Sequence, residues 1–285
     1  ILAQVSDPHV SLPGVRLYGG YDPAAALTAV LARIEALLPR PDFVFFTGDL
    51  VEFGEPAEYA HFLELLAGFS LPCAAIPGNH DRRDAFQAAL AGSPVRIGLD
   101  PDSAHLAIDD LALRVIGLDT LGLDGEPGGR LDAGQLSWLE RRLGDTPDRP
   151  TPIFLHHPPF ATGIDAMDRS GLARPERLAA IVAPHPGILR VSCGHVHRSV
   201  ETLWAGVPAG SCPAVAWQIP LFAPHAPLGL APGAPAFQLH RWTETTREMR
   251  FEDRRWYRVR VAVTATHIKA WLDDEAIVDV ATSGR

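Results

Sequence analysis

Short apolar runs alternate with longer amphipathic stretches along the first 90 residues of the chain. Residues 1–5, 43–47 and 73–76 are largely apolar, whereas residues 23–38 and 56–66 repeat apolar side chains every three or four positions. A short apolar run predicts a strand buried on both faces, and the longer period predicts an amphipathic helix. This order of strand, helix, strand, helix, strand is typical of parallel strands joined by crossover helices.

The starts of the predicted helices carry recognisable signals. Asp22 is a favourable N-cap residue, and Pro23 suits the first position of a helix. Pro56 marks the start of the second helix in the same way. A third, short helix is expected around residues 82–90.

The second part of the chain mixes hairpins with further strand and helix units. Two apolar runs flank Asp109 and Asp110, which predicts a hairpin. Residues 161–174 are expected to form a loop. The remaining elements are expected to be a helix that Asp132 caps, strands at 152–155 and 188–192, a helix at 175–182, and a hairpin over 200–210.

The pattern divides the chain into three expected parts. Residues 1–210 hold the strand and helix alternation and form the main domain. Residues 211–250 begin with a stretch rich in Pro, Gly and Ala, which is typical of a cap over a site or of an oligomer contact. Residues 251–285 return to alternating apolar and polar positions and are expected to form a β-hairpin tail.

Composition narrows the class of protein. The 285 residues are 47% hydrophobic and 21% charged, which is typical of a soluble globular protein. No apolar run reaches the roughly 20 residues of a membrane span, and no secretory leader precedes the first strand, so we expect no membrane partner. The net charge of −9 argues against binding to nucleic acid. Cys73, Cys193 and Cys212 lack the spacing of metal ligands and are expected to be buried free thiols of a cytoplasmic protein.

Clusters of polar residues follow five of the predicted strands. In the clearest one, a strand ends at Pro77-Gly78 and three polar residues come next. Because ligands gather at the carboxyl ends of strands in such sheets, we expect these clusters to face one site. The five clusters are Asp7-Pro8-His9, Gly48-Asp49, Gly78-Asn79-His80-Asp81, His156-His157-Pro158 and Gly194-His195-Val196-His197.

The side chains in these clusters suit metal ions. Imidazole nitrogen mixed with carboxylate oxygen favours Mn, Fe, Co or Zn. Eight residues of ligand type are too many for one ion and match two. Two ions roughly 3.5–4 Å apart can clamp the attacking and leaving oxygens of a phosphoryl displacement.

Two backbone features support convergence on one site. Asp7 with His9, and His195 with His197, are pairs two residues apart, and such pairs point the same way in an extended chain. Glycines precede Asp49, Asn79 and His195, where they would let the backbone turn sharply and approach closely.

From Asp7 to His197, the five clusters resemble the motifs of the calcineurin-like metallophosphoesterase superfamily. The resemblance is closest to the class III cyclic nucleotide phosphodiesterases and the bacterial glycerophosphodiesterases. It also rests on Leu17-Tyr18-Gly19, His156-His157-Pro158-Pro159 and Ala166-Met167-Asp168. It implies an α/β (α+β) fold, a four-layer αββα sandwich of two mixed sheets flanked by helices, here with a C-terminal β extension.

The same resemblance implies two metal shells that share one carboxylate. The ligands would be Asp7, His9 and His197 for one ion, Asn79, His156 and His195 for the other, and Asp49 as the bridge between them. A hydroxide between the ions would attack phosphorus. His80 would contact the phosphate or the leaving group, with Asn79 and His197 also on the substrate side. Both His156 and His157 fit the register of the motif, so the choice between them stays open.

The expected function is metal-dependent hydrolysis of small phosphodiesters, either cyclic nucleotides or glycerophosphodiesters. The alternatives are a phosphomonoesterase or a nuclease on the same fold, or a metal-free interaction scaffold. The intact ligand set speaks against a scaffold, and the acidic balance weakens the case for a nuclease. We also expect a homo-oligomer built on dimers, because apolar residues in the Pro-rich stretch would otherwise face water. These residues are Val215, Trp217, Ile219, Leu221 and Phe222.

Overall fold

The computed structural model describes residues 1–122, 127–220, 233–242, 259–263, 267–272 and 275–281. The chain divides into two units, Ile1–Arg241 and Trp242–Arg285. No helix in the described ranges has both the length and the apolar character needed to cross a membrane.

The first sheet of the first unit is parallel except at one edge. Its order is β11-β1-β2-β3-β4, and only β11 runs antiparallel to its neighbour. This arrangement confirms the predicted parallel strands and crossover helices. The strands are β1 (Leu2–Val5), β2 (Phe43–Thr47), β3 (Cys73–Ile76), β4 (Val95–Arg96) and β11 (Gln238–His240), and the helices are α1 (Pro23–Glu35), α2 (Pro56–Leu66) and α3 (Arg83–Leu90).

The second sheet is mixed. Its order is β5-β6-β7-β8-β10-β9, with antiparallel pairs at both edges and parallel pairs between them. The edge pairs are the two predicted hairpins. The strands are β5 (Leu106–Ile108), β6 (Val115–Leu118), β7 (Thr151–Leu155), β8 (Ile188–Cys193), β9 (Val200–Trp204) and β10 (Val207–Ser211), and the helices are α4 (Ala133–Gly144), α5 (Asp165–Asp168) and α6 (Pro175–Val182).

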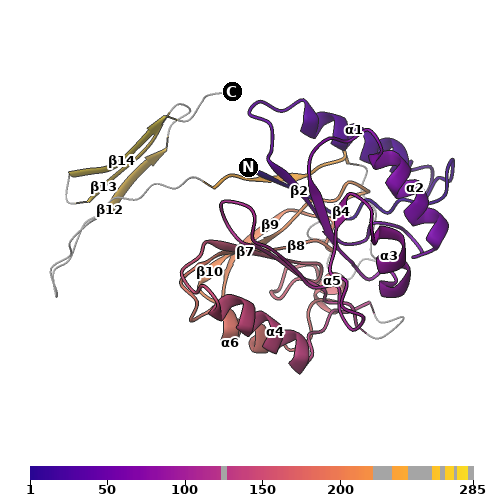
Figure 1. Ribbon diagram of the computed structural model, residues 1–285. Helices are drawn as coiled ribbons and strands as arrows, with labels where there is room; N and C mark the ends of the chain where they lie inside the picture. The colour runs from indigo at the N-terminus through magenta and orange to yellow at the C-terminus, as the bar shows by residue number, and fades with distance from the viewer. Residues whose placement is uncertain (123–126, 221–232, 243–258, 264–266, 273–274, 282–285) are drawn as a thin grey trace. The chain divides into compact units, whose positions relative to one another are not determined.

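Three apolar cores separate four layers of the first unit. One core packs α1, α2 and α3 on the first sheet, and another packs α4 and α6 on the second sheet, as Figure 1 shows. The third lies between the two sheets, where Phe45 of β2 stacks on Phe154 of β7 with ring centroids 4.7 Å apart. The four-layer sandwich is therefore confirmed.

Helix starts follow the predicted caps. The carboxylate of Asp22 accepts the backbone N–H of Ala25, and Asp132 forms a reciprocal capping box with Gln135. One expected loop is corrected, because residues 161–174 contain the single-turn helix α5. The carboxylate of Asp168 accepts the backbone N–H groups of residues 162 and 163, which closes this turn.

The segment that follows β10 does not face water as expected, so the argument for an oligomer from its apolar residues is corrected. Val215, Trp217 and Ile219 are buried within the first unit, so water does not force them into a contact between chains. The segment is tied to the loop after β1, since the N–H groups of residues 215 and 216 donate to the carbonyls of Ser6 and Asp7. Leu221 and Phe222 lie outside the described residues.

The second unit contains a three-stranded antiparallel sheet of β12 (Val259–Val263), β13 (His267–Leu272) and β14 (Glu275–Ala281). These strands confirm the β pattern expected for the tail. The expected domain boundaries after residues 210 and 250 stay predictions, and residues 243–258 around the second one lie outside the described ranges.

Buried His105, which contacts the end of β6, should make the unfolding free energy of the protein depend on pH in the acid range. His105 is buried, and its Nδ1 accepts the backbone N–H of Asp119 at 2.8 Å. Burial lowers the pKa of His105 from 6.5 to about 4. Between these values the unfolded chain binds the proton and the folded chain does not, so stability should fall as the pH falls through this window.

We expect His105→Asn to reduce this acid sensitivity, because the amide oxygen can accept the same N–H and does not titrate. Between pH 7 and pH 4.5, the parent should lose on the order of 2 kcal/mol more unfolding free energy than the variant. Urea unfolding of both proteins at the two pH values measures this difference. Equal losses would show that His105 does not titrate in this way.

Candidate metal centre

The carboxyl ends of strands from both sheets meet at one place in the first unit. His156, which follows β7, donates from Nδ1 to the carbonyl of Thr47 at the end of β2, with the two atoms 2.8 Å apart. The backbone N–H of His195, which follows β8, donates to the carboxylate of Asp7, which follows β1. The five polar clusters predicted from the sequence therefore do converge.

The backbone is strained at this meeting point. Asp7, His9, Asp49, His195 and His197 all have positive φ values, between 47° and 70°, although none is a glycine. Such conformations cost of order 1–3 kcal/mol each and persist only where the surroundings hold them. The expectation of extended i, i+2 pairs was wrong, because both members of each pair lie in the left-handed region.

The glycines before the ligand-type residues serve mainly close approach. A Cβ at Gly48 would overlap the ring of His156, one at Gly78 would overlap the carboxylate of Asp49, and one at Gly194 would overlap Ser6. Only Gly48 also has a positive φ, of 94°. The backbones therefore pack against one another at distances that a side chain would prevent.

One group of possible ligand atoms comes from Asp7, His9, Asp49 and His197, all within 4.8 Å of one another. His9 donates from Nδ1 to the carboxylate of Glu52 at 2.7 Å, and His197 donates from Nδ1 to the carbonyl of Trp217 at 2.8 Å. Each neutral ring then carries its lone pair on Nε2, and the two Nε2 atoms face each other at 3.1 Å. Facing lone pairs repel, so this arrangement fits a cation that both nitrogens bind.

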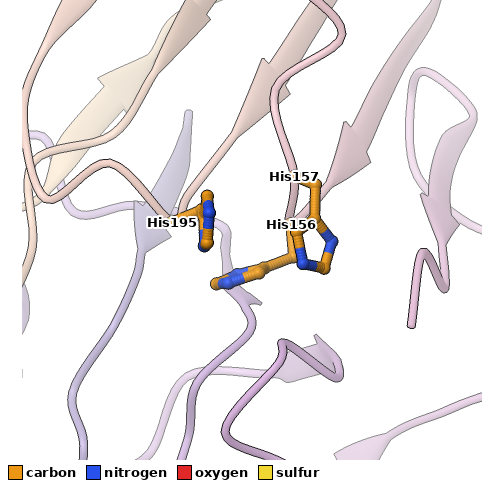
Figure 2. Close-up of side chains that lie close together, drawn as sticks. All are labelled: His156, His157 and His195. Atoms are coloured by element: carbon orange, nitrogen blue, oxygen red, sulfur yellow. The ribbon is translucent and has the colours of Figure 1, made fainter. Parts of the chain in front are cut away.

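The second group lies on the other side of Asp49. With Nδ1 of His156 donating to Thr47, its Nε2 points at the side-chain oxygen of Asn79, 3.0 Å away, and at Asp49 Oδ2, 3.4 Å away. A basic nitrogen facing two oxygen acceptors again fits a cation. His157 and His195 add two further rings, and these three histidines offer nitrogen atoms within 4.8 Å of one another, as Figure 2 shows.

His157 is a buried member of this cluster of rings, but it is oriented differently from His156. Its Nδ1 lies 2.8 Å from the hydroxyl of Thr120, whereas His156 directs Nε2 at Asn79 and Asp49. Burial and the charge of His156 hold the pKa of His157 well below its ordinary value. The geometry thus favours His156 over His157 as the ligand.

Asp49 is shared by the two groups. Its Oδ2 lies 3.6 Å from Nε2 of His9 and 3.4 Å from Nε2 of His156, so one oxygen faces a ring from each group. Its Oδ1 accepts the backbone N–H of His80 at 2.8 Å. This position is the one that a bridging ligand between two ions requires.

Charges in the site attract cations. Burial lowers the pKa of His156, but the carboxylates of Asp49 and Asp7 outweigh it and raise the pKa to about 9. Burial likewise raises the pKa of Asp49, yet the neighbouring imidazoles of His156 and His80 hold it well below its ordinary value. The same carboxylates that favour protons on the imidazoles would favour metal ions in their place.

His80 lies at the edge of the site, about one-third exposed. Its Nδ1 donates to the backbone carbonyl of Glu52 at 2.8 Å, and its ring contacts His9 edge-on at 4.6 Å between centroids. With a proton fixed on Nδ1, its Nε2 can donate only when the ring is an imidazolium. Burial lowers the pKa of His80, but the carboxylates of Asp49 and Glu52 and the bond to the Glu52 carbonyl raise it above the ordinary value.

Glu52 is the site residue that the sequence analysis missed. It is buried, its carboxylate binds Nδ1 of His9 and the hydroxyl of Tyr18, and it lies 3.7 Å from Nδ1 of His80. Burial raises the pKa of Glu52, but the hydrogen bonds from His9 and Tyr18 outweigh it, so the group is ionised. No local signal marks Glu52, because its contact with His9 depends on the pairing of two loops at Val10 and Val51.

Asp81 is a buried residue that connects the loop after β2 with the turn after β3. Its carboxylate accepts the backbone N–H groups of Leu50 and Gly78 and the hydroxyl of Tyr59. Burial and the nearby charge of Asp49 raise the pKa of Asp81 to about 7. Asp81 therefore fixes the turn that presents Asn79 and His80.

Two bacterial proteins named as phosphodiesterases are similar in sequence to this chain. The glycerophosphodiester phosphodiesterase GpdQ of Enterobacter lignolyticus is 36% identical over 220 residues, which cover 77% of this chain and 79% of that protein. The 3',5'-cyclic adenosine monophosphate phosphodiesterase CpdA of Escherichia coli strain K12 is 31% identical over 266 residues, covering 90% of this chain and 91% of that protein.

The fold is also similar to that of a solved metalloenzyme. A dimetal phosphatase from Danio rerio superposes with a TM-score of 0.61 over 100% of this chain and 98% of that chain, at 15% identity, a likeness that concerns the fold alone. The sequence model of the calcineurin-like phosphoesterases matches residues 2–199. With histidine and aspartate clusters suited to a binuclear metal site, the chain belongs to the calcineurin-like phosphoesterase family.

Proposed function

We propose that this protein is a binuclear metal-dependent phosphodiesterase that hydrolyses small phosphodiesters. The observation that carries this proposal is the position of Asp49, whose Oδ2 faces a histidine of each ligand group. The names of the related phosphodiesterases support a diester substrate, with either a cyclic nucleotide or a glycerophosphodiester as the natural one.

In this proposal each side chain that converges on the site has a role. Two divalent ions of Mn, Fe, Co or Zn, when bound, supply a nucleophile at neutral pH and neutralise charge on the phosphate. The ligands are Asp7, His9 and His197 for one ion, Asn79, His156 and His195 for the other, and Asp49 as the bridge. The tautomers support this set, because Thr47, Glu52 and Trp217 hold three rings with Nε2 free.

His80 is the proposed proton donor. Its Nδ1 is bound to the Glu52 carbonyl, so Nε2 is the atom left to meet the substrate. From there an imidazolium donates to a phosphate oxygen or to the departing alkoxide. Asn79 and His197 are proposed to contact the phosphate on the substrate side.

Glu52 positions His9 in this scheme. The carboxylate fixes the proton of His9 on Nδ1 and leaves Nε2 for the metal, an arrangement that raises the basicity of a ligand.

The protein is further proposed to work in the cytoplasm as a homo-oligomer and without nucleic acid. Its three free, buried cysteines fit a reducing compartment, and its net charge of −9 disfavours a polyanion.

The first test is a substrate panel combined with metal analysis. Loaded with Mn²⁺, the protein should hold two ions per chain. It should cleave bis-(p-nitrophenyl) phosphate faster than p-nitrophenyl phosphate, and removal of the metal by EDTA should abolish both rates. Asp49→Ala should lose more metal and more activity than His9→Ala, because it removes a carboxylate between two like charges. A single ion per chain, or a preference for the monoester, would refute the proposed function.

His80→Ala should separate metal binding from proton transfer. The variant should keep both ions and lose about 10²–10⁴-fold in kcat/KM on an alkyl diester. The loss should be smaller on an aryl diester, because nitrophenolate leaves without a proton. Equal losses on both diesters would make His80 a positioning residue, and loss of an ion would make it a ligand.

Glu52→Gln should weaken one metal site without unfolding the protein. The neutral amide can still accept from His9 but no longer adds charge, so affinity for Mn²⁺ should fall about 10- to 100-fold at one site. Calorimetric titration measures both sites directly. Glu64→Gln, which neutralises an exposed residue of the nearby helix α2, is the matched control and should bind as the parent does. Identical titrations for both variants would remove Glu52 from the site.

A further inference from the structure

Exposed apolar side chains gather in the loops that carry the candidate ligands. Eight large hydrophobic side chains of the described residues are exposed, and half of them follow β1 or β2. These four are Leu12, Val15, Tyr18 and Phe53. Contiguous exposed apolar patches that polar residues surround mark ligand-binding sites.

Tyr18 and Phe53 lie on two loops that are locked together. Val10 pairs with Val51, and the backbone N–H of Glu52 donates to the carbonyl of Val10 at 3.1 Å. Glu52 follows this pairing and precedes Phe53 in the chain. Tyr18 thus contacts Glu52 through its hydroxyl, Phe53 follows Glu52 in the chain, and Glu52 itself binds His9.

Tyr18 is fixed in place at both ends of its side chain. Its hydroxyl donates to Glu52, and its ring meets the ring of Trp217 at 4.4 Å between centroids, inclined by 61°. Trp217 in turn lies against His9 at 4.8 Å and His197 at 5.2 Å. Yet Tyr18 remains 55% exposed, so it reaches from the candidate metal centre to solvent.

The backbone at both aromatic residues is held rather than free. Tyr18 has a φ of 41°, a conformation that costs energy for a residue other than glycine. The N–H of Phe53 donates to the carboxylate of Glu58 at 2.9 Å, and that carboxylate also accepts the hydroxyl of Ser11. Phe53 is 62% exposed despite this anchoring, which leaves its ring available to a ligand.

We propose that Tyr18 and Phe53 form an aromatic rim that selects phosphodiesters bearing a planar aromatic group, such as a nucleobase. The inference rests on the proposed phosphodiesterase function and makes these two residues determinants of its specificity. Stacking of a base on an aromatic side chain contributes about 1–3 kcal/mol. A glycerol group has neither a π-face nor a positive charge, so the rim stabilises the nucleotide and not a diester that bears only glycerol groups.

The test compares two substrates in single alanine variants of the Mn²⁺-loaded protein. For Tyr18→Ala and Phe53→Ala, the ratio of kcat/KM for cyclic AMP to that for glycerophosphoglycerol should fall about tenfold, through KM for cyclic AMP. Leu203→Ala is the matched control, because Leu203 is 78% exposed on the edge strand β9, and its ratio should equal that of the parent. An unchanged ratio in both rim variants would overturn the proposal.

Tyr18→Phe separates the ring from its hydroxyl. This variant keeps the π-face and loses the bond to Glu52, so its substrate ratio should stay near that of the parent. A ratio that falls as far in Tyr18→Phe as in Tyr18→Ala would overturn stacking at Tyr18, since the hydroxyl alone would then account for the effect.

Equilibrium binding supplies a readout that needs no turnover. Calorimetric titration with 5'-AMP should show about tenfold weaker binding in each alanine variant, and titration with glycerol 3-phosphate should show no such difference from Leu203→Ala. Equal weakening for both ligands would overturn the rim as a selector of aromatic groups. If the parent cleaves neither diester, the proposed function fails, and the 5'-AMP titration still decides whether the rim binds a base.

Discussion

The carboxylate of Asp49 lies between two groups of imidazoles, and the arrangement of the site depends on it. One of its oxygens faces His9 and His156, and the other accepts the N–H of His80. A buried carboxylate needs positive charge or hydrogen-bond donors around it. The first sheet supplies Asp49 and His9, and the second supplies His156, so the two sheets must pack closely for this carboxylate to be satisfied.

Close packing of backbones makes this convergence possible. Gly48, Gly78 and Gly194 leave no room for a Cβ, and five of the expected ligands adopt left-handed backbone conformations. These conformations are unfavourable in isolation, so the stability of the surrounding sandwich maintains them. The apolar cores between and outside the sheets therefore contribute directly to the geometry of the site.

Hydrogen-bond acceptors around the candidate ligands determine which nitrogen faces inward in three of the imidazole rings. Thr47 and Trp217 act through backbone carbonyls and Glu52 through its carboxylate, and each leaves an Nε2 atom facing inward. Glu52 also connects His9 to Tyr18, so the candidate metal centre and the aromatic rim share one support. In this way a single buried acid connects a proposed metal ligand to the surface that we propose meets the substrate.

The sequence alone determined most of the elements, the four-layer fold through its family resemblance, and the residues that converge at the strand ends. Periodicity and caps act over a few residues, which is why α1, β2 and α6 fall where the pattern predicts them. The single-turn helix α5 was missed, because four residues are too few to show a period.

Tertiary structure alone decided which ring nitrogens face inward, that His156 rather than His157 points at Asn79, and that Glu52 belongs to the site. It also showed that Val215, Trp217 and Ile219 are buried within the first unit. The physical reason is the same in each case. These contacts join residues that are far apart in the chain, such as His156 and Thr47, and only the packing of two sheets brings them within hydrogen-bonding distance.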